Sequence, residues 1–231
     1  MNRLENGREL LDGILAPEAR AATLDDVDRL NAWFGGYALT LREVRRLCEL
    51  APAGRTLVIA DVGGGRGELA IRIARWARRA GRRVRILVVD HDGETLALGA
   101  GLRRAYPEIT LIRGDATALP LGRGTVDVAV AALTLHHLER GGAVACLREM
   151  AAAARLGVVV NDLLRSRLTL GLVWLVTRAY GVHPVSRHDG PLSVRRAYSP
   201  AELRDLAVEA GAVRLDVERH ALLGRIVAVL A

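Results

Sequence analysis

Short apolar segments alternate with amphipathic helical segments from residue 56 to residue 162, and this alternation limits the folds open to the chain. The segments that we predict as strands are 56–60, 84–89, 109–112, 126–131 and 157–160, with further strand-like runs at 213–217 and 225–230. Helices are predicted at 68–79, 94–105 and 143–155. Continuous apolar strands separated by helices indicate a parallel sheet that is covered on both faces. With right-handed crossovers, the sequence predicts an α/β fold with a doubly wound, mostly parallel, seven-stranded sheet.

Small or polar residues follow the predicted strands. The residues at these ends are Asp61, Asp90, Asp115, the segment 133–137, Asn161 and Asp162. Ligands of doubly wound sheets bind beyond the carboxyl ends of the strands. We therefore expect a single ligand-binding crevice at this edge of the sheet.

The loop after the first predicted strand is rich in glycine, with the pattern Asp61-x-Gly63-x-Gly65-x-Gly67. A glycine turn between a strand and a helix lets backbone N–H groups approach a ligand closely. The dinucleotide fingerprint needs glycine at its sixth position, where counting from Gly63 gives Glu68. A phosphate-binding Walker loop is also excluded, because the chain contains no lysine.

This glycine pattern resembles the first motif of the class I S-adenosylmethionine-dependent methyltransferases, which have a Rossmann-like fold. In that family the loop wraps the amino-acid part of the methyl donor, and the acid before the glycines helps to hold its ammonium group. The resemblance implies that Asp90 binds the ribose hydroxyls and that Asp115 and Ala116 contact the adenine. The expected donor site comprises Asp61, Gly63, Gly64, Gly65, Gly67, Asp90, His91, Asp115, Ala116 and Leu133. The alternative is that the acids only cap helix N-termini.

Three further segments support a more specific resemblance. Leu-Thr-Leu-His-His-Leu at 133–138 resembles a segment of the ubiquinone/menaquinone-biosynthesis-type methyltransferases. Residues 30–36 and 187–198 resemble bacterial methyltransferases of polyketide-type secondary metabolism. These resemblances imply S-adenosylmethionine as the cofactor, S-adenosylhomocysteine as the product, and a small phenolic, quinol or carboxylate acceptor.

We expect an N-terminal helical cap at 1–50 and a methyltransferase domain at 51–231. An insert at about 163–198 follows the fifth strand and is expected to cover the acceptor. After it, Ser199 with Glu202 three residues later predicts a capping box at a helix start.

Histidine is the natural base for a hydroxyl acceptor, since its ordinary pKa lies near ~6.5. The candidates for the catalytic base are His136, His137 and His188. The candidates for binding the acceptor are His183, Arg187, Arg195 and Trp174, with the arginines facing an acidic group. The alternatives are structural roles for the histidines, a solvated loop with internal ion pairs, and core packing for Trp174.

Charge and cysteine content narrow the function classes. The net charge is +7, but all 33 basic residues are arginine and they are scattered, so we expect no nucleic-acid partner.

Cys48 and Cys146 are isolated, and no metal-ligand spacing exists, so no metal is expected. Residues 1–15 have no long apolar run, so we expect no signal peptide, and the apolar run 168–177 is shorter than the about 20 residues that span a bilayer. We expect a cytoplasmic monomer or homodimer.

Several alternatives to O-methylation of a small molecule remain open. Carbon is the next choice of acceptor atom, and nitrogen is not excluded. An NAD(P)-dependent oxidoreductase would share Asp90, but the glycine spacing, Asp61 and Asp115 disfavour it, and a Tyr-x-x-x-Lys motif is impossible without lysine. An RNA methyltransferase would commonly carry Asn/Asp-Pro-Pro-aromatic where this chain has Ala-Leu-Thr-Leu at 132–135. A binding-only protein with a degenerate donor site is disfavoured by the intact glycine loop.

Overall fold

The computed structural model describes residues 1–5 and 7–231, and its centre is a seven-stranded sheet in the order β3-β2-β1-β4-β5-β7-β6. The strands are β1 (Leu57–Val62), β2 (Val84–Asp90), β3 (Ile109–Arg113), β4 (Val126–Ala132), β5 (Ala154–Leu163), β6 (Leu215–His220) and β7 (Arg225–Leu230). Strands β1 to β5 pair in parallel, and β7 runs antiparallel to β5 and β6. The predicted doubly wound, mostly parallel sheet is confirmed.

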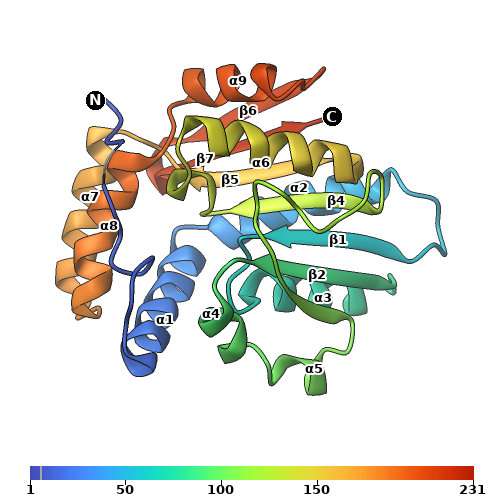
Figure 1. Ribbon diagram of the computed structural model, residues 1–231, viewed down its shortest axis with the longest axis horizontal. Coiled ribbons are helices and arrows are strands. Elements are labelled where there is room, and N and C mark those ends of the chain that lie inside the picture. The colour runs from blue at the N-terminus through green and yellow to red at the C-terminus, as the bar shows by residue number, and fades with distance from the viewer. Residues whose placement is uncertain (6) are drawn as a thin grey trace.

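Helices surround this sheet on both faces and at one end (Figure 1). They are α1 (Pro17–Trp33), α2 (Gly36–Glu49), α3 (Glu68–Arg79), α4 (Gly93–Leu98), α5 (Leu102–Ala105), α6 (Arg140–Ala153), α7 (Arg167–Ala179), α8 (Pro184–Arg196) and α9 (Pro200–Glu209), with short 3₁₀ turns η1 (Leu135–His137) and η2 (Ala221–Leu223). Helices α6 and α9 cover one face and α2 and α3 the other, while α1, α7 and α8 stand beyond the carboxyl ends of the central strands.

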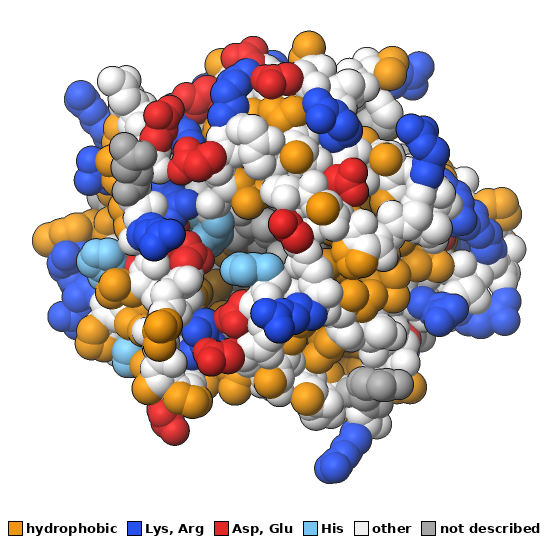
Figure 2. Space-filling model, in the orientation of Figure 1, with side chains coloured by type: hydrophobic (Ala, Val, Ile, Leu, Met, Phe, Trp, Pro, Cys, Tyr) orange, Lys and Arg blue, Asp and Glu red, His pale blue; other side chains and the backbone are white. Residues whose placement is uncertain are grey.

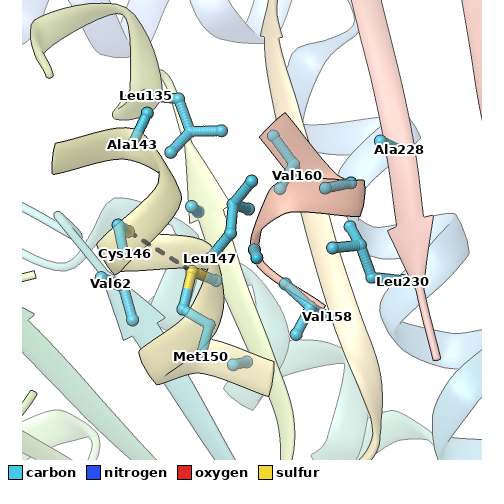
Figure 3. Packing of buried hydrophobic residues seen from close by; sticks show 14 of the residues in the cluster. Val62, Leu135, Ala143, Cys146, Leu147, Met150, Val158, Val160, Ala228 and Leu230 are labelled. Carbon is cyan, nitrogen blue, oxygen red and sulfur yellow. Dashed lines mark hydrogen bonds between the residues drawn. The ribbon is translucent and has the colours of Figure 1, made fainter. Parts of the chain in front are cut away.

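Two aliphatic cores hold the layers together. Leu147 and Met150 of α6 pack on Val158 and Val160 of β5, as Figure 3 shows. On the opposite face, residues of α2 and α3 such as Ile73 pack on β1 and β2. Because burying one aliphatic side chain contributes about 1.5–3 kcal/mol, these contacts fix both helix layers with almost no aromatic residues.

The order of the strands places a binding crevice at the centre of the sheet. Chain order runs outward from β1 to β2 and β3 on one side, and from β4 to β5 on the other. In doubly wound sheets ligands bind where this order reverses. The glycine loop after β1 and the turn η1 after β4 both lie at this switch point.

The first residues of the chain differ from the prediction of an entirely helical cap at 1–50. Among residues 1–5 and 7–16, none lies in a helix, and α1 begins only at Pro17. This segment, which we call the N-terminal strap, runs beside α8 (Figure 1). Its backbone is held by Asp189, whose carboxylate accepts hydrogen bonds from Leu10 N and Leu11 N at 2.9 Å each.

The polar stretch 181–191 also differs from the solvated loop that we weighed for it. Residues 184–191 of this stretch belong to α8, with Pro191 inside the helix, and the polar residues of α8 at 186, 189, 193 and 196 are buried. Their spacing of three and four residues is helical, so one polar face of α8 packs inward against the strap, α1 and η1. The capping box of Ser199 and Glu202 is confirmed at the start of α9.

The predicted helix at 94–105 is divided into α4 and α5, which Gly99 and Gly101 separate. None of the described helices is long and apolar enough to cross a membrane.

Candidate active site

A cavity of about 830 Å³ opens at the carboxyl ends of β1, β2, β4 and β5. Helices α1, α7 and α8 and the N-terminal strap form its other walls. Figure 2 shows a hollow in this face of the molecule, with histidine and acidic side chains around it. Nine of the ten residues predicted for the donor site line the cavity; they are Asp61, Gly63, Gly64, Gly65, Asp90, His91, Asp115, Ala116 and Leu133. The tenth, Gly67, instead caps α3 with φ 97°.

The glycine loop has a shape that other residues could not adopt. Gly63 and Gly65 have φ of 67° and 59°, in the left-handed region that favours glycine. At Gly64 a Cβ atom would lie 2.7 Å from Cγ of Asp61 and 2.8 Å from Cγ1 of Val88. The backbone can therefore approach a ligand here, and only glycine fits beside the buried acid.

Asp61 is a buried carboxylate with an unsatisfied oxygen. Its side chain is 1% exposed, and Oδ2 has no hydrogen-bond partner within the described part of the chain. Burial raises the pKa of Asp61 to about 7, with smaller contributions from Asp90 and Glu68. An ammonium group placed beside Oδ2 would both satisfy and ionise this carboxyl.

The two other strand-end acids organise their own loops as well as facing the cavity. The Asp90 carboxylate accepts hydrogen bonds from Gly65 N at 2.8 Å and Asp92 N at 3.0 Å. The Asp115 carboxylate accepts from the backbone N–H of Thr117 at 2.7 Å and from its hydroxyl at 2.8 Å, and these bonds lower the pKa of Asp115. Asp90 and Asp115 can therefore accept hydrogen bonds from their own loops and still lie on the cavity wall.

Leu133 has a strained backbone at the end of β4. Its φ of 57° is the only positive value among the described residues other than glycine. A left-handed conformation costs a residue with a Cβ roughly 1–2 kcal/mol. The surrounding bonds stabilise it, since Leu133 N donates to Asn161 O at 2.9 Å and the Thr134 hydroxyl donates to Val62 O at 3.1 Å. Such strain gathers at functional sites.

Two histidines and three acids, Glu9, Asp12, His136, His137 and Asp162, form what we call the histidine–carboxylate cluster. Nδ1 of His136 lies 2.6 Å from the Asp162 carboxylate, and Nδ1 of His137 lies 3.0 Å from that of Asp12. The two Nε2 atoms lie 3.8 and 3.9 Å from oxygens of Glu9. Ligand atoms of Glu9, His136 and His137 all fall within 4.8 Å of one another, a grouping that no spacing in the sequence indicates.

The cluster is assembled from distant segments. Glu9 comes from the strap, and its Oε2 accepts a hydrogen bond from the Ser193 hydroxyl of α8 at 2.8 Å. Arg196 of α8 donates from Nε to His136 O at 3.1 Å and from Nη2 to His137 O at 2.7 Å. Helix α8 therefore fixes both the strap and η1.

Electrostatics within the cluster favour positive charge at its centre. Burial alone would lower the pKa of His137, but Glu9 and Asp12 outweigh it and raise the pKa to about 9. Burial would raise the pKa of Asp162, yet His136 and two backbone N–H groups lower it.

A buried arginine without a partner forms another part of the cavity wall. Arg225, the first residue of β7, is 3% exposed, and its Nε and Nη1 have no hydrogen-bond partner among residues 1–5 and 7–231. Burial lowers the pKa of Arg225 to about 10. The carboxylate of Asp162, whose charge raises the pKa of Arg225, is already engaged by His136.

The five residues predicted in the insert are not among the residues that line the cavity. His188 is half exposed and lies 2.7 Å from Asp189, and His183 caps α8 through Nδ1, which accepts from Val185 N at 3.3 Å. Trp174 is 51% exposed. The five candidates are His183, Arg187, His188, Arg195 and Trp174, and their roles toward the acceptor stay predictions.

The helical form of the insert explains why these side chains lie off the cavity. The cavity-lining residues of α8 are Ser186, Asp189, Gly190 and Ser193, and those of α7 are Thr169, Leu172, Val173, Val176 and Thr177. Residues at other helical positions point elsewhere. An apolar wall therefore exists on α7, but Trp174 is not part of it.

Glu9, Asp12 and Arg225 were missed as site residues. An arginine at the head of the otherwise apolar run 225–230 was the available signal for Arg225. Glu9 and Asp12 lie in a segment whose position depends on tertiary contacts to α8, so no local pattern marks them.

The comparisons with known proteins agree with this geometry. A family model described as a methyltransferase domain matches residues 59–157. The chain is 40% identical over 78 residues to a ubiquinone/menaquinone biosynthesis C-methyltransferase of Caulobacter vibrioides, covering 32% of this chain and 31% of the relative. It is 30% identical over 116 residues to a protein of Mycolicibacterium smegmatis named as an S-adenosylmethionine-dependent methyltransferase, covering 50% of this chain and 39% of the relative. The chain thus spans about a third of the length of these curated relatives.

Among solved structures, the CurJ carbon methyltransferase matches with a TM-score of 0.63 at 13% identity, covering 84% of this chain and 53% of that chain. This likeness shows a shared fold. The sheet order, the glycine loop with its acids and the matched domain all agree with the resemblance seen in the sequence. Residues 59–157 are similar to this methyltransferase domain, and the findings fit a class I S-adenosylmethionine-dependent methyltransferase.

Proposed function

We propose that this chain transfers the methyl group of S-adenosylmethionine to an acidic oxygen of a small molecule, a phenol, quinol or carboxylate. The observation that carries the proposal is a pair of unsatisfied charges on the wall of one cavity. Asp61 offers a buried carboxylate oxygen without a partner, and Arg225 offers a buried guanidinium without one, both among the described residues. A buried charged group without a partner destabilises the folded protein, and a ligand that pairs with it removes this cost.

The residues at the donor end fit the cofactor. The unpaired Oδ2 of Asp61 suits its ammonium group, and the close approach permitted by Gly63, Gly64 and Gly65 suits its amino-acid part. We assign Asp90 to the ribose hydroxyls and Asp115 with Ala116 to the adenine, supported by their places on the wall. When bound, the cofactor supplies an electrophilic methyl group on a sulfonium.

Arg225 lies away from this donor end. Three strand spacings separate β1, which carries Asp61, from β7, which begins with Arg225. Since neighbouring strands lie about 4.8 Å apart, about 14 Å of sheet separates the two strands. We therefore assign Arg225 to the acceptor, where it would bind a carboxylate or a phenolate oxygen.

The histidine–carboxylate cluster is the part of the cavity that we assign to acceptor activation. An acceptor hydroxyl must lose its proton as its oxygen forms the new bond to the methyl carbon, while the carbon–sulfur bond breaks and its electron pair stays on sulfur. His136 and His137 line the same cavity as the glycine loop. Of the three histidines expected as bases, these two keep that role in the proposal and His188 loses it, because His188 lies off the cavity.

The charges on the cavity wall favour a small acceptor over a nucleic acid. Among the described lining residues, nine are Asp or Glu and four are Arg. Nucleic-acid sites need basic residues to neutralise phosphates. An acidic wall would repel a phosphate backbone, which agrees with the scattered arginines of the sequence.

C-methylation is the second candidate. It is favoured by the match to a C-methyltransferase of Caulobacter vibrioides, although that match covers only 31% of the relative. In an activated phenol or quinol, Arg225 would hold the oxygen and the carbon beside it would accept the methyl group. The donor site and the cluster would be the same.

Incubation of the protein with S-adenosylmethionine carrying a ¹³C-methyl group tests both candidates. The panel contains polyketide-type phenols, quinols and aromatic carboxylates, with the neutral methyl ether or amide of each as a matched control. We expect label on oxygen, seen by its NMR shift, in an acidic acceptor but not in its neutral partner. Label on carbon would select the second candidate. Equal labelling of neutral compounds or of RNA would overturn the proposal.

A further inference from the structure

We propose that Glu9, His136 and His137 form a site for one divalent transition-metal cation at the acceptor side of the cavity. All three line the cavity, and Glu9 and His136 are buried. Binding of a metal ion at this site does not depend on the proposed methyl transfer. Only the role of the ion in activating the acceptor rests on the proposed function.

The spacing of the three side chains fits ligands of one ion better than a hydrogen-bonded network. Nε2 of His136 lies 3.8 Å from Oε1 of Glu9, and Nε2 of His137 lies 3.9 Å from Oε2. Hydrogen bonds of this kind need about 2.7–3.2 Å. An ion at about 2.0–2.2 Å from each ligand atom spaces two ligands by up to about 4.4 Å. The three groups therefore converge on a gap of the size that a metal ion fills.

One ligand atom is unsatisfied without an ion. Oε1 of Glu9 is buried and has no hydrogen-bond partner in the described chain, whereas Oε2 accepts from Ser193. Glu9 is thus held at one oxygen and directed toward the gap with the other.

Each imidazole has a carboxylate behind it. His136 engages Asp162 through Nδ1 at 2.6 Å, and His137 engages Asp12 through Nδ1 at 3.0 Å. Metal-binding histidines almost always donate their other N–H in this way, which fixes the ring and makes Nε2 a stronger ligand. Both histidines here share that arrangement.

The charged groups around the proposed site favour a divalent cation. Glu9, Asp12 and Asp162 supply three negative charges, and Arg196 supplies one positive charge, with its Nη1 3.8 Å from Glu9 and 3.7 Å from Asp12. Metal binding requires neutral imidazoles, and with both imidazoles neutral the cluster has a net charge of about −2, which buried groups need to have compensated. One divalent ion compensates it.

Two imidazoles and one carboxylate select the class of ion. This donor set suits zinc, manganese, iron(II) or cobalt(II), whereas magnesium and calcium prefer oxygen ligands throughout. Three protein ligands leave at least one coordination position open toward the cavity. With an ion bound, the two imidazoles would serve as ligands instead of as bases. An acceptor hydroxyl at the open position would then give its proton to water at a lower pH than when free, and its oxygen would attack the methyl carbon.

The experiment is a calorimetric titration of chelator-treated full-length protein with Zn²⁺ and Mn²⁺, with Co²⁺ added for its visible absorption bands. We expect one ion per chain in the wild type. Glu9→Gln keeps the size and the bond to Ser193, and His137→Ala removes a ligand, so each should lower the affinity at least tenfold. His220→Ala, which changes a histidine outside the cluster whose Nε2 lies 3.1 Å from Glu218, should bind as the wild type does. Binding of S-adenosylhomocysteine shows that each variant is folded.

The outcomes separate this site from the proposed function. Absence of an ion from the wild type, or binding that Glu9→Gln and His137→Ala leave unchanged, would overturn the site. Full methyl transfer by metal-free protein would overturn the metal's role in activation and leave the proposed function standing. One bound ion with no transfer to any acceptor would support the site and count against the proposed function.

Discussion

Asp162 holds His136 at two points: its carboxylate accepts from Nδ1 at 2.6 Å and from the backbone N–H of His136 at 3.1 Å. The first bond directs Nε2 toward Glu9, and the second fixes the turn η1 that carries the ring. Asp162 is the second-last residue of β5 and follows Asn161, which accepts the hydrogen bond from the strained Leu133, so the rigid sheet sets the direction of the imidazole. Asp162, which does not line the cavity, thereby positions the imidazole of His136, which does.

Replacing Asp162 with Asn should lower turnover with the true acceptor by about 10–100-fold, because the partners behind metal-binding or basic histidines have effects of this size. Binding of S-adenosylhomocysteine should stay unchanged, since the donor residues are elsewhere. The matched control is Asp216→Asn, an exposed acid on β6. Steady-state kinetics would contradict the positioning role if both variants turned over like the wild type.

Gly64→Ala should remove donor binding. The new Cβ would lie 2.7 Å from Cγ of Asp61 and 2.8 Å from Val88, closer than real Cβ contacts, so the loop or the acid must shift. Gly141→Ala on α6 meets no atom within 4 Å and should stabilise the helix by up to about 1 kcal/mol. Calorimetry with S-adenosylhomocysteine compares the two. Wild-type affinity in Gly64→Ala would disprove the assignment of the loop.

Donor affinity should depend on pH through Asp61. Its pKa in the free protein is about 7, so below that value the carboxyl is mostly protonated and cannot pair with an ammonium group. The affinity for S-adenosylhomocysteine should rise about tenfold per pH unit toward 7 and then level off. Asp61→Asn should bind weakly with no such rise. A wild-type affinity that is flat from pH 5.5 to 7.5 would refute this.

The same group should influence the stability of the unliganded chain in the opposite direction. Its folded pKa of about 7 is above the ordinary 3.8, so the folded state binds this proton more tightly. The stability that Asp61 contributes is therefore present below about pH 4 and is lost as the pH rises through about 7. Asp61→Asn should raise the melting temperature relative to the wild type more at pH 8 than at pH 5. An equal change at both values would show that the carboxyl is not perturbed.

Arg225→Met should raise the acceptor KM by about 10–100-fold, because a hydrogen bond to a charged group contributes roughly 1.5–3 kcal/mol. The melting temperature should not fall, since the arginine is buried without a partner and methionine restores an apolar side chain of similar length. Kinetics with an acidic acceptor and thermal unfolding give the two readouts. A lower melting temperature with an unchanged acceptor KM in Arg225→Met would show that Arg225 has a structural role instead.

The sheet and most of the strand-end residues that line the cavity could be predicted from the sequence alone, because both depend on local patterns. Apolar runs followed by Asp61, Asp90 and Asp115 set the strands and their ends, and the structure places all three acids on the cavity wall. The glycine loop is equally local, since its shape follows from the conformational freedom of Gly63 and Gly65.

The acceptor side could not be predicted in the same way. Glu9 reaches His136 only because Asp189 and Ser193 of α8 hold the strap, and these contacts join residues more than 170 positions apart. The polar residues of 181–191 suggested a loop, although the buried polar residues of α8 recur at 186, 189, 193 and 196, which is a helical spacing. His188 and Trp174 were assigned by residue type, and the rotation of each helix turns them away from the cavity.

Calorimetric titration of the full-length wild type with S-adenosylhomocysteine, with NAD(H) run in parallel, tests the central claim most directly. The structure predicts one site per chain with micromolar affinity for S-adenosylhomocysteine, sharply weakened in Asp61→Asn, and no binding of NAD(H). Absence of S-adenosylhomocysteine binding, or tight binding of NAD(H), would contradict the assignment of the cavity to a methyl donor.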